Sequence, residues 1–199
     1  MFSENKIIRD GAVVSDDWQL MPAAAVENAA TAIVPTGNVL VPLTVWIAQR
    51  EALIGRISGP NLPIQPIGVW LDGADDPSQI KDSIDRFAVI AVNFPKFTDG
   101  RGYSTAALLR SRYGFTKELR AIGDVLRDQL FYLRRAGFNA FEVRADKDID
   151  DALNGLNDFS ESYQGAVDQP LPLFKRRSAP PSSQLRSNTQ AASIEAIHG

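Results

Sequence analysis

Short apolar runs alternate with longer amphipathic segments along most of the chain. The run over 87–94 is apolar almost throughout, which is typical of a strand covered on both faces. Strand–helix units of this length favour a parallel sheet with right-handed crossovers. The expected elements are strands over 39–41, 67–71, 87–94, 118–122 and 140–143, with helices over 42–54, 77–86, 104–113, 125–136 and 149–159.

Cap and turn residues support several of these boundaries. Pro42 suits the first position of a helix, and Gly55 is expected to end that helix. Asp76 and Asp124 each precede a helical segment and can cap it, and Gly114 is expected to stop the segment before it. These signals predict where each strand–helix unit begins and ends.

The two ends of the chain differ from this alternation. Residues 6–14 place Asp10 and Gly11 between two β-prone runs, which predicts a tight hairpin. Residues 178–190 are polar and rich in Pro and Ser, and we expect them to be disordered. The predicted fold is α/β: a mostly parallel sheet built from βα units, as an open sheet or a half-barrel, with an N-terminal β-hairpin and a disordered C-terminal tail. The predicted division is a hairpin and linker over 1–38, one α/β domain over 39–174, and a basic, polar tail over 175–199.

The composition excludes several kinds of chemistry. The chain has no cysteine, which removes disulfides, thiolate nucleophiles, iron–sulfur ligation and cysteine-type zinc sites. The single histidine, His198, lies in the polar tail, so a histidine-based triad or an imidazole metal cluster is not expected. Chemistry must therefore use Asp, Glu, Lys, Arg, Tyr, Ser or Thr, or a bound cofactor.

The charge distribution bears on partners and location. The formal net charge is −3, and because residues 175–199 carry four Lys or Arg against one Glu, the rest of the chain carries −6. So acidic a body argues against general nucleic-acid binding, which needs clustered cations. No apolar run approaches the roughly 20 residues of a membrane helix, and no secretory signal is evident. We therefore expect a cytoplasmic protein that binds no membrane.

Two loops at the carboxyl ends of predicted strands carry most of the candidate chemistry. Ligands of open α/β sheets bind at this edge, and the loops span 94–104 and 123–129. In the first loop Lys96 and Arg101 supply cationic donors, and Ser104 opens the next helix. A helix N-terminus with cations nearby suits a small oxyanion or a phosphate. The loop matches neither a Walker A motif nor a dinucleotide fingerprint.

Purely structural roles account for many of the same residues. Asp99 can form a turn with Gly100, and Asp124 can be only a helix cap. Arg127 can project to the ligand edge or pair with an acid, and Tyr103 is more typical of packing than of catalysis. Glu142 lies in an apolar strand, either at an edge or as a buried charge that needs a partner such as Arg120.

At these residues the sequence resembles a known bacterial family. The similarity is carried by residues 92–106, 109–114, 118–132 and 135–141, including the run Phe-Pro-Lys-Phe-Thr-Asp-Gly-Arg-Gly-Tyr-Ser over 94–104. Members of this family are described as probable oxidoreductases of sulfite reduction and tend to be encoded beside assimilatory sulfite reductase. Many relatives carry a cysteine where this chain has Ala136, so the resemblance implies no general thiol mechanism. The motif positions it implies as functional are Lys96, Asp99, Arg101, Tyr103, Asp124 and Arg127.

The resemblance implies a pathway, sulfate assimilation, and leaves three functional hypotheses. The first is an accessory protein that acts with sulfite reductase and binds a small oxyanion at the first loop. The second is an enzyme at the same site, in which Lys96 and Arg101 clamp an anion and Asp99 or Asp124 acts as acid or base. A redox version of it needs a bound nicotinamide or flavin, because the chain has no electron carrier of its own. The third is an adaptor without a small-molecule site.

Overall fold

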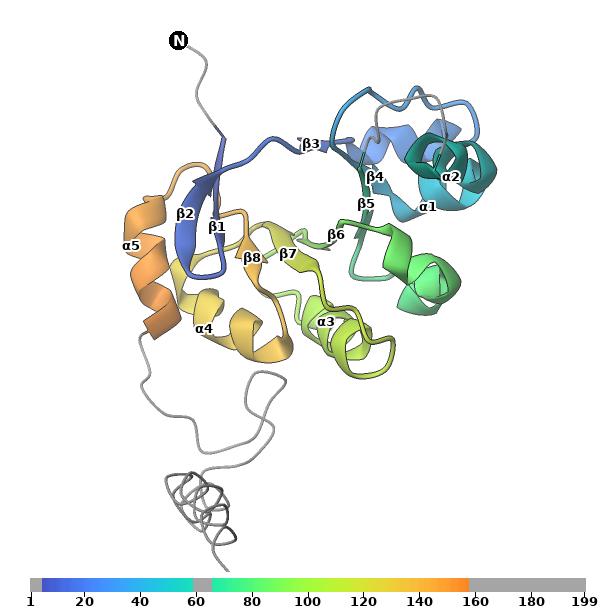
Figure 1. The fold of residues 1–199 in the computed structure, drawn as a ribbon. Helices are drawn as coiled ribbons and strands as arrows, with labels where there is room; N and C mark the ends of the chain where they lie inside the picture. Colours follow the sequence, from blue (N-terminus) through green and yellow to red (C-terminus); the bar gives the residue numbers. More distant parts are fainter. Residues whose placement is uncertain (1–4, 59–65, 158–199) are drawn as a thin grey trace, which may run out of the picture.

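Eight strands join into one curled, open sheet in the computed structural model, which describes residues 5–58 and 66–157 (Figure 1). The strands are β1 (Lys6–Arg9), β2 (Ala12–Ser15), β3 (Gln19–Leu20), β4 (Val39–Pro42), β5 (Ile67–Leu71), β6 (Val89–Phe94), β7 (Glu118–Gly123) and β8 (Ala140–Phe141). The α-helices are α1 (Leu43–Ala48), α2 (Arg50–Ser58), α3 (Arg101–Ser111), α4 (Arg127–Ala136) and α5 (Ile149–Asn154), and the 3-10 helices are η1 (Ala23–Asn28), η2 (Pro77–Arg86) and η3 (Gly155–Asn157). The predicted C-terminal tail lies outside the described residues.

The strand order is β2-β1-β8-β7-β6-β5-β4-β3, and the six strands from β3 to β8 are parallel. This confirms the mostly parallel sheet of βα units. The predicted hairpin is also confirmed, since Arg9 pairs with Ala12 and the two turn residues Asp10 and Gly11 have φ angles of 51° and 81°. Such paired positive angles define the tight turn that matches the twist of a hairpin. The hairpin joins the sheet through β1, which pairs antiparallel with β8.

The two edge strands of the sheet are neighbours along the chain. Only Asp16, Asp17 and Trp18 separate β2 from β3. Four peptide steps span about 14 Å at most, so Ser15 and Gln19 lie within that distance although they belong to opposite edges of an eight-stranded sheet. The sheet must therefore curl back on itself, and the half-barrel is the form that the structure adopts.

The sheet separates two apolar clusters. Alternate residues, among them Val69, Val92 and Leu119, face the helices and form the larger core. The opposite face, here called the inner face, carries the smaller cluster of Leu40, Trp70, Val89, Ala91 and Ile122. Trp18 packs against this smaller cluster, and a Cβ on Gly68 would lie 3.2 Å from the Trp18 ring. A Cβ there would come closer still to Leu40 and to the Val89 carbonyl oxygen, so the absence of a side chain at position 68 leaves room for the two neighbouring strands as well as for the tryptophan.

A buried group of charges lies beside this cluster on the inner face. The guanidinium of Arg120 donates to both carboxylate oxygens of Asp16 at 2.8 and 3.0 Å, and to Glu118 at 2.8 Å. The side chains of Arg120 and Asp16 are only 1% and 2% exposed. Burial alone lowers the pKa of Arg120, but its bonds and charge contacts with Asp16 and Glu118 outweigh this and raise the pKa. The interaction ties the β2–β3 connection to the middle of β7.

Glu142 lies near the charges of Arg120 and Asp16, and we expect it to make the stability of the protein depend on pH. Burial raises the pKa of Glu142, while Arg120 lowers it and Asp16 raises it. A carboxyl whose pKa is raised in the folded state destabilises the protein where it is ionised, and this cost disappears as the pH falls towards its unfolded value. We therefore expect Glu142→Gln to be more stable than the wild type at pH 8 and the difference to close below about pH 4.5.

Urea unfolding at several pH values, followed by far-UV circular dichroism, measures this difference. Glu51→Gln is the matched control, because Glu51 is exposed on α2. A constant difference between Glu142→Gln and the wild type from pH 4 to 8 would contradict the assignment.

Several boundaries differ from the sequence expectation. The helix expected over 42–54 is two helices, because the backbone leaves the helical conformation at Gln49, whose side chain instead donates to the carbonyls of Ala29 and Ala32. Gly55 does not end a helix, and α2 continues to Ser58. The segment 16–38 also contributes β3 and η1. No helix in the described ranges is long and apolar enough to cross a bilayer.

Candidate functional site

The candidate site lies where β5, β6, β7 and β8 end, an area here called the carboxyl edge. Parallel strands present their carboxyl ends at one edge of the sheet, so the loops that follow them are neighbours. The charged and polar residues of the carboxyl edge are Asp72, Asp75, Asn93, Lys96, Asp99, Arg101, Asp124, Arg144 and Asp146.

Asp99 and Arg101 form the best-defined pair at this edge. The Nε and Nη2 atoms of Arg101 donate to the two oxygens of Asp99 at 2.9 and 2.6 Å, and its backbone amide donates to the same carboxylate at 3.1 Å. Side-chain and backbone hydrogen bonds from Arg101 hold the pKa of Asp99 at about 2. Asp99 therefore stays ionised at neutral pH, and it occupies the amide of the first residue of α3.

Asp99 is thus better suited to orient Arg101 than to act as a general base. A general base is most effective when its pKa lies near the working pH, and the pKa of Asp99 is far below it. The arginine side chain is still 59% exposed, against 15% for the aspartate. The outer side of the guanidinium therefore faces solvent in a fixed orientation.

The loop after β5 packs against this pair. A Cβ on Gly73 would lie 3.2 Å from both the Arg101 guanidinium and the Asp99 carboxylate, so a side chain there would push the pair from its position by a few tenths of an ångström. Asn93 on β6 donates to the Oδ1 atom of Asp72 at 3.2 Å. Two strand ends are thereby linked, and Asp72 adds negative charge near Arg101.

Asp124 links the loops after β6, β7 and β8. Its Oδ2 atom accepts from the backbone amide of Phe97 at 2.9 Å, and its Oδ1 atom accepts from Arg144 at 2.8 Å. The predicted role of Asp124 as a helix cap is wrong. The capping position of α4 is Leu126, and its amide donates to the side chain of Gln129 at 3.0 Å. The aspartate lies too early in the chain to cap α4, and the two loops beside it use both of its oxygens.

The remaining predicted residues lie near this edge in different roles. Ser104 does not cap a helix, because α3 begins three residues earlier at Arg101 with Gly100 as its capping position. Tyr103 is half-buried and packs edge-on against Phe94, with the two ring centroids 5.6 Å apart. Arg127 reaches towards α5, with its Nε atom 3.7 Å from Asp151. The structure thus brings Asp99 and Arg101 together and places Arg127 against α5.

Lys96 is the cation of the carboxyl edge that remains without an ion pair among the described residues. It lies in the same turn as Asp99, whose amide donates to the Lys96 carbonyl at 2.9 Å. In residues 5–58 and 66–157 no three His, Cys, Asp or Glu side chains are grouped to hold a metal ion. The arrangement can offer two exposed cationic groups, Lys96 and the outer side of Arg101, to a small anion.

Sequence reasoning missed Asp72, Asn93 and Arg144. Asp72 directly follows β5, Asn93 is the polar residue within β6, and Arg144 follows β8 after Glu142 and Val143, so the position of a polar residue at or near a strand end was a usable signal. Their contacts cross between loops that are about 20 residues apart along the chain.

Fold and site together define an α/β half-barrel protein with a polar carboxyl edge that combines cations and carboxylates. The chain belongs to a bacterial family described as proteins of unknown function, DUF934, whose profile matches residues 68–174. The match covers more than half of the chain, and it includes every residue of the carboxyl edge and excludes the strands from β1 to β4. Neither the curated proteins nor the solved structures include a match to the chain.

Proposed function

We propose that this protein is an accessory protein of assimilatory sulfite reduction that binds sulfite reductase and holds a small oxyanion at the carboxyl edge. The observation that carries the proposal is the state of Arg101, which Asp99 fixes in orientation while its side chain remains 59% exposed. The resemblance of residues 92–141 to proteins encoded beside the reductase supports the choice of pathway. Lys96 supplies the second cation.

The charges of the site favour weak, exchangeable binding. Charge-assisted hydrogen bonds from a guanidinium and an ammonium group suit the oxygens of sulfite or sulfate. The carboxylates of Asp99 and Asp72 lie close to Arg101 and reduce the positive potential that an anion meets. Modest affinity fits a protein that passes its anion to a partner enzyme better than one that stores it.

Calorimetric titration of the purified protein into sulfite reductase, with and without sulfite, tests the proposal. We expect the wild type to bind the reductase saturably. For Arg101→Ala we expect the affinity for sulfite to fall at least about tenfold, since a hydrogen bond to a charged group contributes about 1.5–3 kcal/mol. The matched control is Arg112→Ala, an exposed arginine at the other end of α3.

Other outcomes would change the assignment. If Arg101→Ala binds the reductase as well as the wild type does at every sulfite concentration, the reductase remains the partner but this oxyanion site is excluded. No binding to the reductase, combined with sulfite-dependent oxidation or reduction of added nicotinamide, would replace the accessory role with the cofactor-dependent oxidoreductase considered above.

A further inference from the structure

The free edge of β3 lies beside an apolar pocket and several exposed apolar side chains. The amides of Gln19 and Met21 donate to the carbonyls of Asn38 and Leu40, on the side of β4. Alternate residues of a strand turn their backbone groups to opposite sides, so the N–H and C=O of Leu20 face away from β4. β3 ends the sheet, and within the described chain no strand covers that side. The opposite edge, at β2, is packed against α5.

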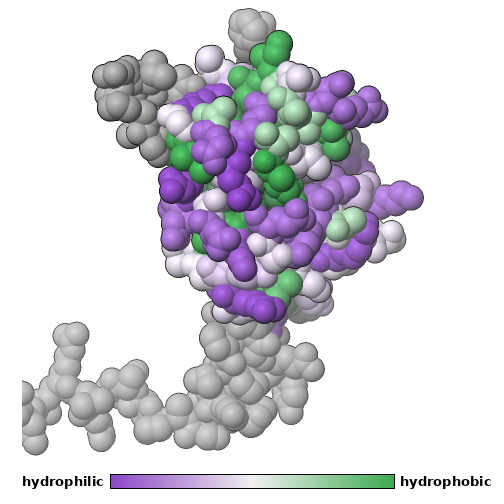
Figure 2. Space-filling model, turned by 90° about the vertical axis from the view of Figure 1, so that its right-hand side faces the viewer, coloured by the Kyte–Doolittle hydropathy of each residue, from purple (hydrophilic) through white to green (hydrophobic). Residues whose placement is uncertain are grey.

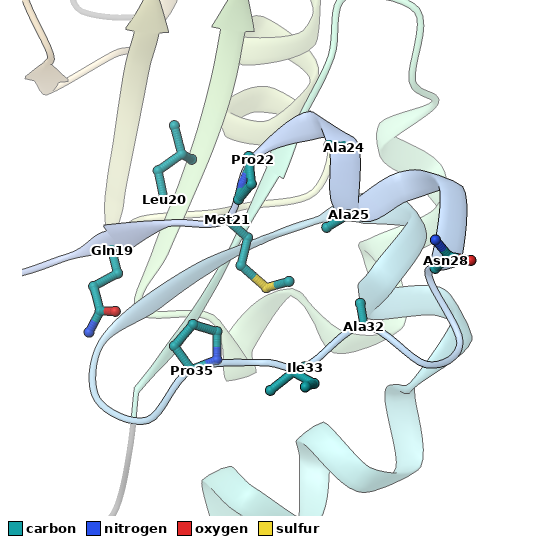
Figure 3. Close-up of a pocket in the computed structure, with 10 residues that line it drawn as sticks. All are labelled: Gln19, Leu20, Met21, Pro22, Ala24, Ala25, Asn28, Ala32, Ile33 and Pro35. Carbon is teal, nitrogen blue, oxygen red and sulfur yellow. The ribbon is translucent and has the colours of Figure 1, made fainter.

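An apolar pocket of about 350 Å³ lies beside this edge (Figure 3). It is an open surface pocket lined by β3, η1 and the returning segment that carries Ala32, Ile33 and Pro35. Hydrogen bonds from residues outside the pocket fix the backbone of its lining segments. Gln49 donates to the carbonyls of Ala29 and Ala32 at 2.7 and 2.9 Å, and the Trp70 indole donates to the Met21 carbonyl at 3.0 Å. The pocket is therefore formed before anything binds in it.

Two residues that line the pocket have exposed apolar side chains, Leu20 at 45% and Ile33 at 89%. Val26 and Ile47, in the same segment 20–47, are 39% and 41% exposed. Figure 2 shows apolar side chains gathered in a band on the side of the molecule that carries α1 and α2. Contiguous exposed apolar surface of this kind is typical of an interaction site.

The charge of this surface favours a copy of the same chain as its partner. None of the ten residues that line the pocket is charged, whereas the chain as a whole carries a formal charge of −3. In a two-fold symmetric contact the same patch lies on both sides, so a net charge of the patch would face an equal net charge of the same sign. Because the pocket lining itself is uncharged on an acidic protein, two copies can meet there without that repulsion; Glu27 on η1 is the exposed acid next to it in the chain.

The backbone of β3 is also self-complementary. Two antiparallel strands that place one residue opposite its copy exchange two N–H···O=C bonds between these residues. Leu20 has both groups turned outward, whereas the amide of Trp18 donates to Asp16 and Pro22 has no amide hydrogen. When Leu20 lies opposite its copy, the outward N–H and C=O of each residue both find a hydrogen-bond partner. A longer partner strand would find no further free N–H group on β3.

We propose that a second copy of this chain binds here, with the two β3 strands antiparallel, Leu20 opposite Leu20, and the apolar patches packed together. Each copy covers the exposed Leu20 and Ile33 of the other. The proposal does not depend on the pathway or on the oxyanion site, because the surface lies outside the carboxyl edge.

Sedimentation equilibrium of the full chain over about 1–100 µM tests the proposal, because a dimer and its dissociation follow mass action. The expected result is a mass that rises from 21.8 kDa towards twice that value with concentration. Leu20→Lys and Ile33→Asp are expected to raise the dissociation constant at least about tenfold. Leu108→Lys is the matched control, since Leu108 is an exposed leucine on α3 and is 37% exposed.

Far-UV circular dichroism confirms that each variant is folded. A mass of 21.8 kDa at every concentration overturns the proposal, and so does a dimer that neither substitution weakens. Loss of reductase binding in Leu20→Lys, with a wild type that stays monomeric, would assign the surface to a different protein and would equally overturn it. Arg101→Ala is expected to leave self-association unchanged, so failure here and failure of the proposed function are distinguishable.

Discussion

Replacing Arg120 by methionine is expected to lower the free energy of unfolding by about 3–5 kcal/mol, because the change leaves the buried carboxylate of Asp16 without its counter-charge. Asp16, only 2% exposed, would lose both of its hydrogen bonds from the guanidinium, and Glu118 would lose one. Methionine fills similar space and is apolar, so the cost arises mainly from the uncompensated charge of Asp16, since Glu118 keeps its ion pair with Arg9. Urea unfolding followed by tryptophan fluorescence measures it.

A double substitution separates the charge effect from packing. Asp16→Asn in the Arg120→Met background removes one stranded charge and is expected to recover part of the loss, which a packing defect would not. Arg112→Met, at an exposed arginine, is expected to change stability by less than about 0.5 kcal/mol. Equal stability of Arg120→Met and the wild type would show that the buried pair contributes nothing.

The second large effect is expected for Gly123→Ala, at about 2–5 kcal/mol of destabilisation from a left-handed backbone together with overpacking. Gly123 has a φ of 94°, and a Cβ there would lie 2.6 Å from both the Asn93 side-chain oxygen and the Phe94 carbonyl. Since Phe94 O also accepts from the amide of Asp124, the strain would spread into the carboxyl edge. Thermal and urea unfolding both report it.

Gly55→Ala is the matched control for this substitution. Gly55 lies within α2, and a methyl group there would meet no other atom within 4 Å, so alanine is expected to stabilise the protein by about 0.5–1 kcal/mol. Opposite signs at the two glycines would support the conformational argument. A stable Gly123→Ala would mean that the strand end can shift to accept a side chain.

The regular part of the fold follows from local pattern. The apolar runs within 67–71, 87–94 and 118–122 predict β5, β6 and β7, and the Asp10–Gly11 turn predicts the hairpin. β3 is only two residues long, and it belongs to the sheet through hydrogen bonds with a strand about 20 residues away. The pairing of β1 with β8 joins distant segments. Neither feature leaves a periodic signal in the chain.

The sequence predicts where the residues of the candidate site lie, but it does not predict their hydrogen-bond partners. The sequence places Asp99, Arg101 and Asp124 on loops at strand ends, and the structure locates them there. It does not indicate that Asp99 turns back onto Arg101, or that Asp124 accepts from Phe97 and Arg144 instead of capping a helix. A capping aspartate and a loop-bridging aspartate have the same local sequence. What separates them is a residue that arrives from another strand.

The antiparallel pairing of β1 with β8 has a consequence for synthesis of the protein. The hairpin leaves the ribosome early, yet Asp10 and Asn139, which are hydrogen-bonded next to this pairing, are 129 residues apart. At about 5–20 residues per second, the hairpin waits roughly 6–26 s for β8. Ribosome-bound chains that stop short of residue 141 are expected to leave the outer edge of β1 unpaired and sensitive to protease. Chains that expose β8 beyond the exit tunnel are expected to become resistant in one step.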